Sequence, residues 1–535
     1  MTIQLTYLLV PIILAWVAYR LLRRSPLANI PGPQPEPFFG NVRHMVERSN
    51  VDVMFEWQEQ YGSVFRVQSF LGLNKLVIAD PKAIQYVLNA AAYDFPKPAP
   101  LRAFIIALSG PHLIWAEGDV HKKQRRIMSP AFGAYEMKAL HPVFKHHAEN
   151  LVAQWKDALV NTDDNESRVI DVHRSLNSTT LNALCEAAFN FRAENENGNI
   201  LKEIYMNFNE NVFPPYLATM NGIMDHLPAW VIPPLLKVLP TKNMAFVRRH
   251  KRETYRIAEE LVAEKADTIS SDTGKRDVFS LLVQANKSEY VKNLQLSDDE
   301  LYAQMSLVFA AGHATTAGTM TFALWQLVKH VDVQTQLRNE IREIQATVHG
   351  RGKTELTADD LENMVYLQAV LKETLRMHPA IFQVARVATK DAVLPLSQPV
   401  KTSAGELISQ IAVPRGTEII VSPGCYNRNK SVWGEDAEDF NPQRWLTGER
   451  QSKAGISLGV LGNLMSFWSG TKSCLGWRFA MVEMQCFLVE IVNHFELRPT
   501  RNVHAYGSNL MYPLVEGEEE KGAQMPLRVS VASRD

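Results

Sequence analysis

The pattern of apolar and polar positions begins with a long apolar stretch at the start of the chain. The first nineteen residues carry no charge, and apolar residues continue to Leu22. This approaches the ~20 residues that an α-helix needs to cross ~30 Å of hydrocarbon. Basic residues follow the stretch and none precedes it, the reverse of a cleaved signal peptide, so the rest of the chain is expected in the cytoplasm. Residues 1–24 are predicted to be a membrane anchor. A helix lying on the membrane surface is the alternative.

Prolines mark two further segments. Residues 31–37 read Pro-Gly-Pro-Gln-Pro-Glu-Pro, and alternating prolines favour a stiff, extended chain that cannot continue a helix. Residues 25–40 are therefore predicted to be a hinge that spaces the body from the bilayer. Residues 213–240 hold six prolines among apolar residues. This composition fits a core loop, and it equally fits a surface that dips into the membrane and admits apolar substrates.

Most of the remaining chain has a helical pattern. Ser297 and Glu300 form a capping box before an apolar pattern that runs to about Val331 without a proline. At ~1.5 Å per residue, this pattern predicts one helix of roughly 50 Å that crosses most of the protein.

Further along, Thr357 with Asp360 opens a second helical stretch, which ends before Pro379. Short apolar runs rich in β-forming residues predict strands at Val64–Val67, Leu76–Ile78, Val384–Ala388 and Glu418–Val421. No long linker or low-complexity tract appears after residue 40. The predicted fold class is therefore mainly α with minor β-sheets, in one domain over residues 41–535.

The charge balance is close to neutral, and cysteines are few. Lys and Arg number 56 against 57 Asp and Glu, so a net charge of −1 gives no support for nucleic acid as a partner. The four cysteines include no C-x-x-C pair. This argues against a disulfide framework or a zinc site and favours a reducing compartment. The cysteines are Cys185, Cys425, Cys474 and Cys486.

Cys474 lies in an unusual setting among these cysteines. Gly470 and Gly476 bracket it in the segment Phe467-Trp-Ser-Gly-Thr-Lys-Ser-Cys-Leu-Gly476, and a helical pattern follows at once. Glycines allow tight turns and close approach to a flat ligand, while free N–H groups at a helix start stabilise a thiolate. A thiolate on haem iron favours O–O cleavage. Cys474 is therefore predicted to be the metal ligand, against the default of a buried structural cysteine.

This segment resembles the cysteine loop of the cytochrome P-450 family, Phe-x-x-Gly-x-Arg-x-Cys-x-Gly, in its eukaryotic microsomal and fungal members. The resemblance spans roughly residues 28–515 and implies the cytochrome P-450 fold with haem b as cofactor. It makes Phe467, Lys472, Cys474 and Gly476 cofactor-binding residues. Lys472 takes the usual Arg position, where it keeps the positive charge but loses the planar fork for a haem propionate.

Two further motifs of that family are structural. Glu373-Thr-Leu-Arg376 puts a Glu and an Arg three residues apart on one helix face, where they can pair. Phe440-Asn-Pro-Gln-Arg444-Trp445 resembles the stretch whose arginine joins that pair. The resemblance implies a buried carboxylate held by two arginines. Glu373, Arg376 and Arg444 are thus predicted to fix the core behind the haem and to take no part in catalysis.

Another motif, Ala311-Gly-His-Ala-Thr315-Thr316, resembles the family's Ala-Gly-x-acid-Thr-Thr over the oxygen site. The glycine removes side-chain bulk, and a threonine hydroxyl can bond a carbonyl of the preceding turn and loosen the helix. Thr315 matches the threonine that helps deliver protons and is the predicted catalytic residue. Ala314 stands where the acid would be, and His313, ~100° around the helix, cannot simply replace it. Thr316 is expected to contribute less for the same reason.

The segment Gly118-Asp-Val-His121-Lys-Lys-Gln-Arg125-Arg126 resembles the helix that crosses the proximal haem face. The resemblance makes Arg125 a propionate ligand and places His121 where many members have Trp, so both are predicted to contact the haem. Taken alone, the basic run would be a solvated helix face. A second set of basic residues near that face is predicted to attract an acidic protein: Lys122, Lys123, Arg126 and Arg478.

The predicted function is that of a haem-thiolate monooxygenase, which inserts one oxygen atom from dioxygen into an apolar small molecule. No dinucleotide or flavin motif is obvious, so electrons must come from outside. The resemblance implies NADPH–cytochrome P-450 reductase and a single-pass protein of the endoplasmic reticulum membrane, with a role in secondary metabolism. One alternative is a peroxide isomerase or dehydratase that needs neither dioxygen nor reductase. Ala314 permits this, whereas Thr315 and Thr316 argue against it. A haem sensor or electron carrier is a third class.

The substrate pocket is predicted from the segments Leu101–Leu113, Val308–Thr315, Ala380–Val387 and Ser508–Pro513. Their candidate lining residues are Phe104, Ile105, Phe309, Ala311, Ile381, Phe382 and Met511. Such a lining fits a terpenoid, a steroid, a fatty acid or an aromatic molecule equally well.

Overall fold

Helices make up most of the protein. The computed structural model describes residues 27–160, 167–191, 196–206, 217–269, 277–287, 295–447, 455–507 and 510–533. The longer helices are α3 (Asn50–Tyr61), α5 (Ala99–Ser109), α6 (Gly118–Met128), α8 (His141–Val160), α9 (Val172–Phe189), α10 (Glu196–Met206), α14 (Lys242–Ile269), α15 (Val278–Lys287), α16 (Asp298–Gly312), α17 (Ala314–Lys329), α18 (Val331–Gly350), α20 (Val365–Met377) and α23 (Trp477–His494). The shorter ones are α2 (Val42–Glu47), α4 (Pro81–Gln85), α7 (Ala134–Ala139), α12 (Leu217–Met224), α13 (Ile232–Val238), α19 (Ala358–Asn363), α21 (Pro423–Asn427) and α22 (Lys430–Trp433).

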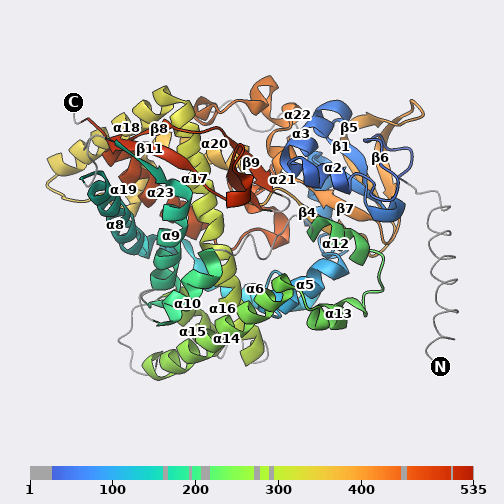
Figure 1. The fold of residues 1–535 in the computed structure, drawn as a ribbon, viewed down its shortest axis with the longest axis horizontal. Coiled ribbons are helices and arrows are strands. Elements are labelled where there is room, and N and C mark those ends of the chain that lie inside the picture. Colours follow the sequence, from blue (N-terminus) through green and yellow to red (C-terminus); the bar gives the residue numbers. More distant parts are fainter. Residues whose placement is uncertain are drawn as a thin grey trace.

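The strands form small sheets. The four-stranded sheet has the order β1-β2-β7-β4, in which β2 and β7 run parallel and join segments far apart in the chain. Its strands are β1 (Val64–Gln68), β2 (Asn74–Ile78), β4 (Val384–Val387) and β7 (Glu418–Val421). The other strands are β3 (Ser167–Asp171), β5 (Ala392–Lys401), β6 (Leu407–Val413), β8 (Phe495–Pro499), β9 (Val503–Gly507), β10 (Met511–Val515) and β11 (Pro526–Val531). The mainly α class and the four predicted strands are confirmed. In Figure 1 the four-stranded sheet lies with α2 and α3, across the molecule from α8, α9 and α10.

The predicted 50 Å helix is divided in two. Its capping box is present at Ser297 and Glu300, but the helix breaks at His313, which separates α16 from α17. The Thr315 hydroxyl donates to the Ala311 carbonyl at 2.8 Å, and the Thr316 hydroxyl donates to the Gly312 carbonyl at 3.3 Å. These hydroxyls occupy carbonyls at the break, and such competition loosens a helix. The prediction of one continuous helix was therefore wrong.

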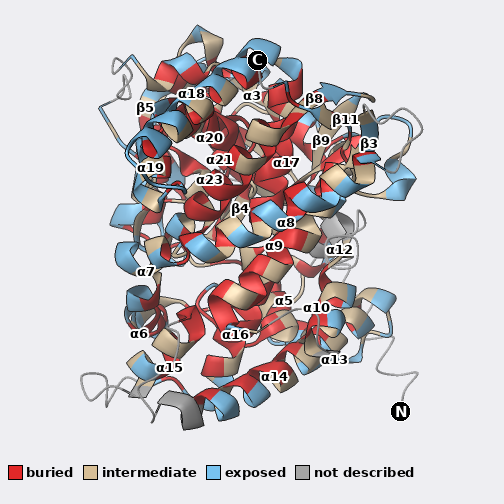
Figure 2. Ribbon diagram, turned by 90° about the vertical axis from the view of Figure 1, so that its left-hand side faces the viewer, coloured by how far each residue is buried: buried red, intermediate tan, exposed pale blue. Residues whose placement is uncertain are grey.

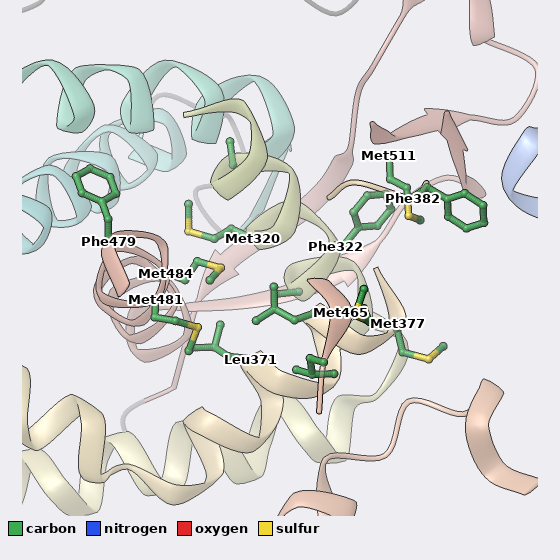
Figure 3. Packing of buried hydrophobic residues seen from close by; sticks show 14 of the residues in the cluster. Met320, Phe322, Leu371, Met377, Phe382, Met465, Phe479, Met481, Met484 and Met511 are labelled. Carbon is green, nitrogen blue, oxygen red and sulfur yellow. The ribbon is translucent and has the colours of Figure 1, made fainter. Parts of the chain in front are cut away.

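Three helices form the centre of the core. Figure 2 shows α17, α20 and α23 as mostly buried ribbons, with exposed residues on the outer helices. Figure 3 shows Met320 of α17 and Met481 and Met484 of α23 where these two helices pack. Unbranched methionines fill irregular gaps between helices that cross at an angle.

The proline-rich segment packs against the body from residue 27 onward. Leu27 and Ile30 are buried, and the backbone N–H of Arg66 donates to the Pro31 carbonyl at 2.8 Å. A Cβ at Gly32 would collide with the Arg66 backbone, so this approach requires glycine. The proposed anchor, residues 1–24, lies outside the described residues. Within the described ranges, no helix combines the length and apolarity needed to span a membrane.

Candidate active site

A cavity of about 410 Å³ lies where α6, α9, α16, α17 and the segment before α23 meet. Thr315 and Cys474 both border it, although 159 residues separate them in the sequence. Most of the other wall residues are apolar. They include Leu113, Ile114, Leu184, Ala188, Leu307, Val308, Ala380, Ile381 and Val384. A cavity with an apolar wall and few polar groups is typical of a binding site for a small organic molecule.

The cysteine loop, residues 465–476, presents Cys474 to this cavity. The Cys474 N–H donates to the Phe467 carbonyl at 2.8 Å and closes the loop. Gly470 has φ +68°, and a Cβ there would collide with the Leu88 carbonyl, so both its conformation and its surroundings require glycine. Gly476 has an ordinary φ of −86°. It borders the cavity, and a Cβ there would lie beside the Phe132 ring. This contact would be an ordinary one, so neither the backbone conformation nor the packing by itself requires glycine at this position.

The thiol of Cys474 is accessible, but protein surrounds the cavity into which it opens. Burial raises the pKa of Cys474 to about 11, against the smaller lowering effects of the Gly476 N–H and of Arg125. The Gly476 N–H at the start of α23 thus acts in the direction that the sequence argument predicts, but burial outweighs it. A coordinated metal cation would deprotonate such a thiol.

The buried carboxylate of Glu373 accepts hydrogen bonds from two arginines and a tryptophan, and this network supports the cysteine loop. Arg376 donates to both of its oxygens at 2.9 and 2.8 Å, and Arg444 donates to one of them at 2.9 Å. The Trp445 indole N–H and the Asn441 backbone N–H each donate at 2.9 Å. The side chains of Glu373 and Arg376 are fully buried, and that of Arg444 is nearly so. The two-arginine contact expected from the sequence is present.

A cluster of cations lines one side of the cavity. Arg125 donates to the Ser473 carbonyl at 2.7 Å and to its hydroxyl at 3.1 Å, which joins α6 to the cysteine loop. Lys472 bonds the carboxylate of Glu117 and donates to the Ala92 carbonyl at 3.3 Å. His121 lies 3.0 Å from the Tyr93 hydroxyl. Burial, with the charges of Lys472 and Arg125, lowers the pKa of His121 to about 4, so its ring is neutral at pH 7.

Sequence reasoning did not name two further members of this cluster, although Arg386 lies in the predicted pocket segment Ala380–Val387. Lys97 lies 3.1 Å from Glu117, and burial, followed by the charge of Arg386, lowers the pKa of Lys97 to about 7. Arg386 is buried on β4, where burial lowers its pKa to about 10. Both border the cavity. Neither residue stands in a local motif. The pairing of β4 with β7 brings Arg386 to the site, and the path of the loop before α5 brings Lys97 there.

The matches to known proteins agree with this geometry. A cytochrome P-450 family model matches residues 30–507. The chain belongs to the cytochrome P-450 family. It is 32% identical to cytochrome P-450 monooxygenase 128 of Postia placenta, over 97% of this chain and 96% of the relative. It is also 32% identical to cytochrome P-450 monooxygenase claQ of Ampulloclitocybe clavipes (95% and 94%) and 30% identical to ganoderic acid synthetase of Ganoderma lucidum (96% and 95%). Family membership makes the chain a haem-iron monooxygenase.

The residues present fit the haem of cytochromes P-450. The two propionates of haem are anionic, and Lys97, Arg125, Arg386 and Lys472 border the cavity with Glu117 as the acidic partner that pairs with both lysines. The Trp468 indole N–H, also on the cavity wall, is buried and has no protein acceptor among the described residues. Such donors would hold carboxylates, and Cys474 would hold the iron. The iron, when bound, supplies the chemistry that activates dioxygen.

The two neighbouring threonines, Thr315 and Thr316, both reach the cavity, whereas the sequence predicted this only for Thr315. Thr315 borders the cavity as predicted, and so does Thr316, which was expected to point away. His313 is buried against the Tyr205 ring, and its Nδ1 lies 3.1 Å from the Phe309 carbonyl. It is not on the cavity wall, in agreement with the view that it cannot replace the acid. Ala314 offers no proton.

The predicted substrate residues divide into two groups. Ala311 and Ile381 line the cavity, whereas the other five are absent from its wall. Phe309 stacks on Phe189 with ring centroids 4.2 Å apart, on the face of α16 turned toward α9. Phe382 packs edge-on against Phe55 in the core. The remaining three side chains that do not reach the wall are Phe104, Ile105 and Met511.

We expect Glu373→Gln to lower the free energy of unfolding by about 3–5 kcal/mol, as for other broken buried ion pairs. The amide keeps the shape of the side chain but leaves two buried guanidinium groups without their carboxylate. Urea denaturation followed by circular dichroism measures the change. Glu496→Gln is the control, because it removes an exposed pair with Arg498, worth about 0–1 kcal/mol. Equal losses in both variants would contradict the role given to Glu373.

Proposed function

We propose that this cytochrome P-450 is a membrane-anchored enzyme that inserts one oxygen atom from dioxygen into an apolar small molecule. Haem b binds through Cys474, and NADPH–cytochrome P-450 reductase supplies electrons. The observation that carries the proposal is the shared cavity, in which the Cys474 thiol, the Thr315 hydroxyl and an apolar wall face the same space. A substrate bound against that wall would lie between the oxygen site and the apolar side chains.

The apolar wall of the cavity suits several classes of substrate: a terpenoid, a steroid, a fatty acid or an aromatic molecule. The relatives described above come from fungi, and one is named for the synthesis of ganoderic acid. This supports a role in fungal secondary metabolism. Comparison of metabolites from cells with and without the protein tests the assignment. Cells without the protein should accumulate the substrate and lack its oxygenated product.

The contact with the reductase is supported by basic residues around the cysteine loop. Arg125 joins α6 to this loop, and three of the predicted docking residues are exposed: Lys122, Arg126 and Arg478. Lys123 is less available, because its side chain is 25% exposed and pairs with Glu300 at 2.8 Å, whereas that of Lys122 is 60% exposed although it pairs with Asp119. An exposed basic surface attracts an acidic partner and accelerates its association at low salt.

A second surface supports attachment to the endoplasmic reticulum membrane. Trp230, Val238 and Phe38 are 78%, 74% and 72% exposed, and Ile223 is half exposed. Phe38 lies before α2, Ile223 lies on α12, and Trp230 and Val238 lie near the two ends of α13; α12 contacts α2, and α13 contacts α5. Large exposed apolar side chains can contact lipid or another partner. This favours the membrane-dipping interpretation of residues 213–240; residues 213–216 lie outside the described ranges.

The reduced, carbon-monoxide-bound protein should show the red-shifted Soret band of a thiolate ligand, and Cys474→Ser should abolish it. Serine keeps the size of the side chain but removes the sulfur that donates electron density to the iron. Absorption spectra of the purified proteins measure the band. The control variants Cys185→Ala, Cys425→Ala and Cys486→Ala should keep it. An unchanged band in Cys474→Ser would refute the assignment of the ligand.

Deleting residues 1–24 should release much of the protein from membranes while haem binding persists. The deletion removes the apolar stretch but leaves the cavity intact, and the exposed side chains around Trp230 should retain a residual fraction. Sedimentation of membranes followed by the haem spectrum of the soluble fraction measures both effects. Trp230→Ser in the shortened protein should reduce the residual fraction further. Complete retention of the shortened protein would show that the anchor lies elsewhere.

Thr315→Ala should keep haem and substrate binding but uncouple the reaction, so that NADPH is consumed, peroxide is released and product falls. A positioned proton donor contributes about 100- to 10,000-fold, so we expect product formation to fall at least ~100-fold. Product, peroxide and NADPH are measured together. Thr335→Ala on α18 is the control, because Thr335 makes the same hydroxyl-to-carbonyl contact on an exposed surface.

Retained coupling in Thr315→Ala would point to the rearranging class of enzyme or to proton delivery by another group. A lipid hydroperoxide added without reductase separates these cases. Rapid turnover of the hydroperoxide identifies an isomerase or dehydratase, and its absence leaves a monooxygenase whose protons come from elsewhere in the cavity wall.

A further inference from the structure

Two buried glutamines, Gln124 on α6 and Gln304 on α16, have no part in the site described so far. Both side chains lie in the core, and the exposed fraction of each residue is 0%. Glutamine is seldom fully buried, because a carboxamide that loses water without gaining hydrogen bonds costs free energy. The bonds that these two side chains make therefore indicate their role.

Both glutamines bind the loop between α5 and α6. The side-chain oxygen of Gln304 accepts from the backbone N–H of Leu113 at 3.0 Å. From the other side, the side-chain amide of Gln124 donates to the Pro111 carbonyl at 2.8 Å. In Figure 1, α5 and α6 lie next to α16. The two bonds thus fix the loop relative to α6 and α16.

The same loop forms part of the cavity wall. Leu113 and Ile114 border the cavity, and so do Leu307 and Val308, which lie one turn after Gln304 on α16. Gln304 itself is not on the wall. Its bond to the loop therefore sets how far apart two apolar parts of the wall lie, without a contact between Gln304 and a bound molecule.

The two helices that carry the glutamines are joined to each other through Glu300. Its carboxylate accepts from Gln124 at 3.0 Å and from Lys123, also on α6, at 2.8 Å. It also accepts from the backbone N–H of Ser297 at 3.0 Å, as part of the capping box that begins α16. The loop is therefore fixed to two helices that are themselves held together.

We propose that Gln304 determines how large a ligand the cavity binds tightly, because it holds Leu113 and Ile114 in the wall. Gln124 supports the loop from α6. Both are positioning residues, since they act through the backbone of the loop. A ligand that fills the cavity as far as this loop requires the bond between Gln304 and Leu113, whereas a small ligand does not. The inference rests on the apolar substrate of the proposed function, but its tests need no turnover.

The first test uses imidazole ligands of increasing size: imidazole, phenylimidazole and bifonazole. An imidazole nitrogen binds iron, so these ligands share one bond to the haem and differ in their apolar groups. Gln304→Leu keeps the approximate size of the side chain and removes the acceptor. Absorption titrations should give an unchanged Kd for imidazole and a Kd for bifonazole that is about tenfold higher, equivalent to about 1.4 kcal/mol. This lies in the range for a lost buried hydrogen bond. An equal change for all the ligands would overturn the proposal.

Two further variants separate this effect from general support of the fold. Gln334 on α18 is the matched control, because its side chain accepts from the Leu497 N–H at 3.0 Å and is not on the cavity wall. Gln334→Leu should leave every Kd unchanged, even where it lowers the thermal unfolding temperature. Gln304→Glu keeps the acceptor oxygen and replaces only Nε2, which has no partner among the described residues. It should keep the natural affinity for bifonazole. An equal loss of that affinity in Gln304→Glu and Gln304→Leu would contradict the role of the bond to Leu113.

Hydrogen exchange tests the loop directly. In the natural protein, bifonazole should slow the exchange of the amides of residues 110–116, whereas imidazole should not; this comparison holds even where Gln304→Leu fails to fold. Gln304→Leu should speed their exchange, because a lost anchor favours local opening, and Gln334→Leu should leave it unchanged. Exchange that responds to neither bifonazole nor Gln304→Leu would overturn the inference. If the natural protein forms no product with NADPH and reductase, the proposed monooxygenase function fails. The Kd values and the exchange rates then still decide the role of Gln304.

Discussion

The carboxylate of Glu373 is the interaction on which the active site depends. It accepts hydrogen bonds from Arg376, Arg444 and Trp445, so it joins α20 to the segment after α22. Hydrogen bonds through Asn427 also connect the cysteine loop to Arg376. The Arg376 guanidinium donates to the Asn427 carbonyl, and the Asn427 side chain accepts from the backbone N–H of Met465 at 3.0 Å. Loss of the carboxylate would thus displace the loop that carries the thiol.

The cavity wall combines an apolar surface with a group of buried cations. An anionic cofactor would stabilise that group of cations. Lys97, Lys472 and Arg386 are buried near one another, and burial lowers the pKa of each. Glu117 pairs with both lysines, but a single carboxylate leaves positive charge uncompensated. A dianionic ligand would relieve this repulsion, and any ligand that binds only the folded state stabilises it. Haem binding and the stability of this wall are therefore coupled.

The sequence predicted those features whose causes are local. Capping boxes, short strands and the pairing of Glu373 with Arg376 depend on residues a few positions apart. Lys97 escaped detection, and Arg386 was predicted only as part of the pocket segment Ala380–Val387, because long-range packing gathers these cations at the cavity. Phe309 was misplaced because an apolar residue on a helix that is apolar on several sides gives no sign of which neighbour it faces. The packing of Phe309 on Phe189 of α9 is decided by tertiary structure.

The break at His313 brings two threonine hydroxyls to the cavity. Where the helix is loosened, the carbonyls of Ala311 and Gly312 accept from two threonine hydroxyls that both border the cavity. Because Ala314 carries no acid, these two hydroxyls are groups at the break that can exchange a proton with a molecule in the cavity.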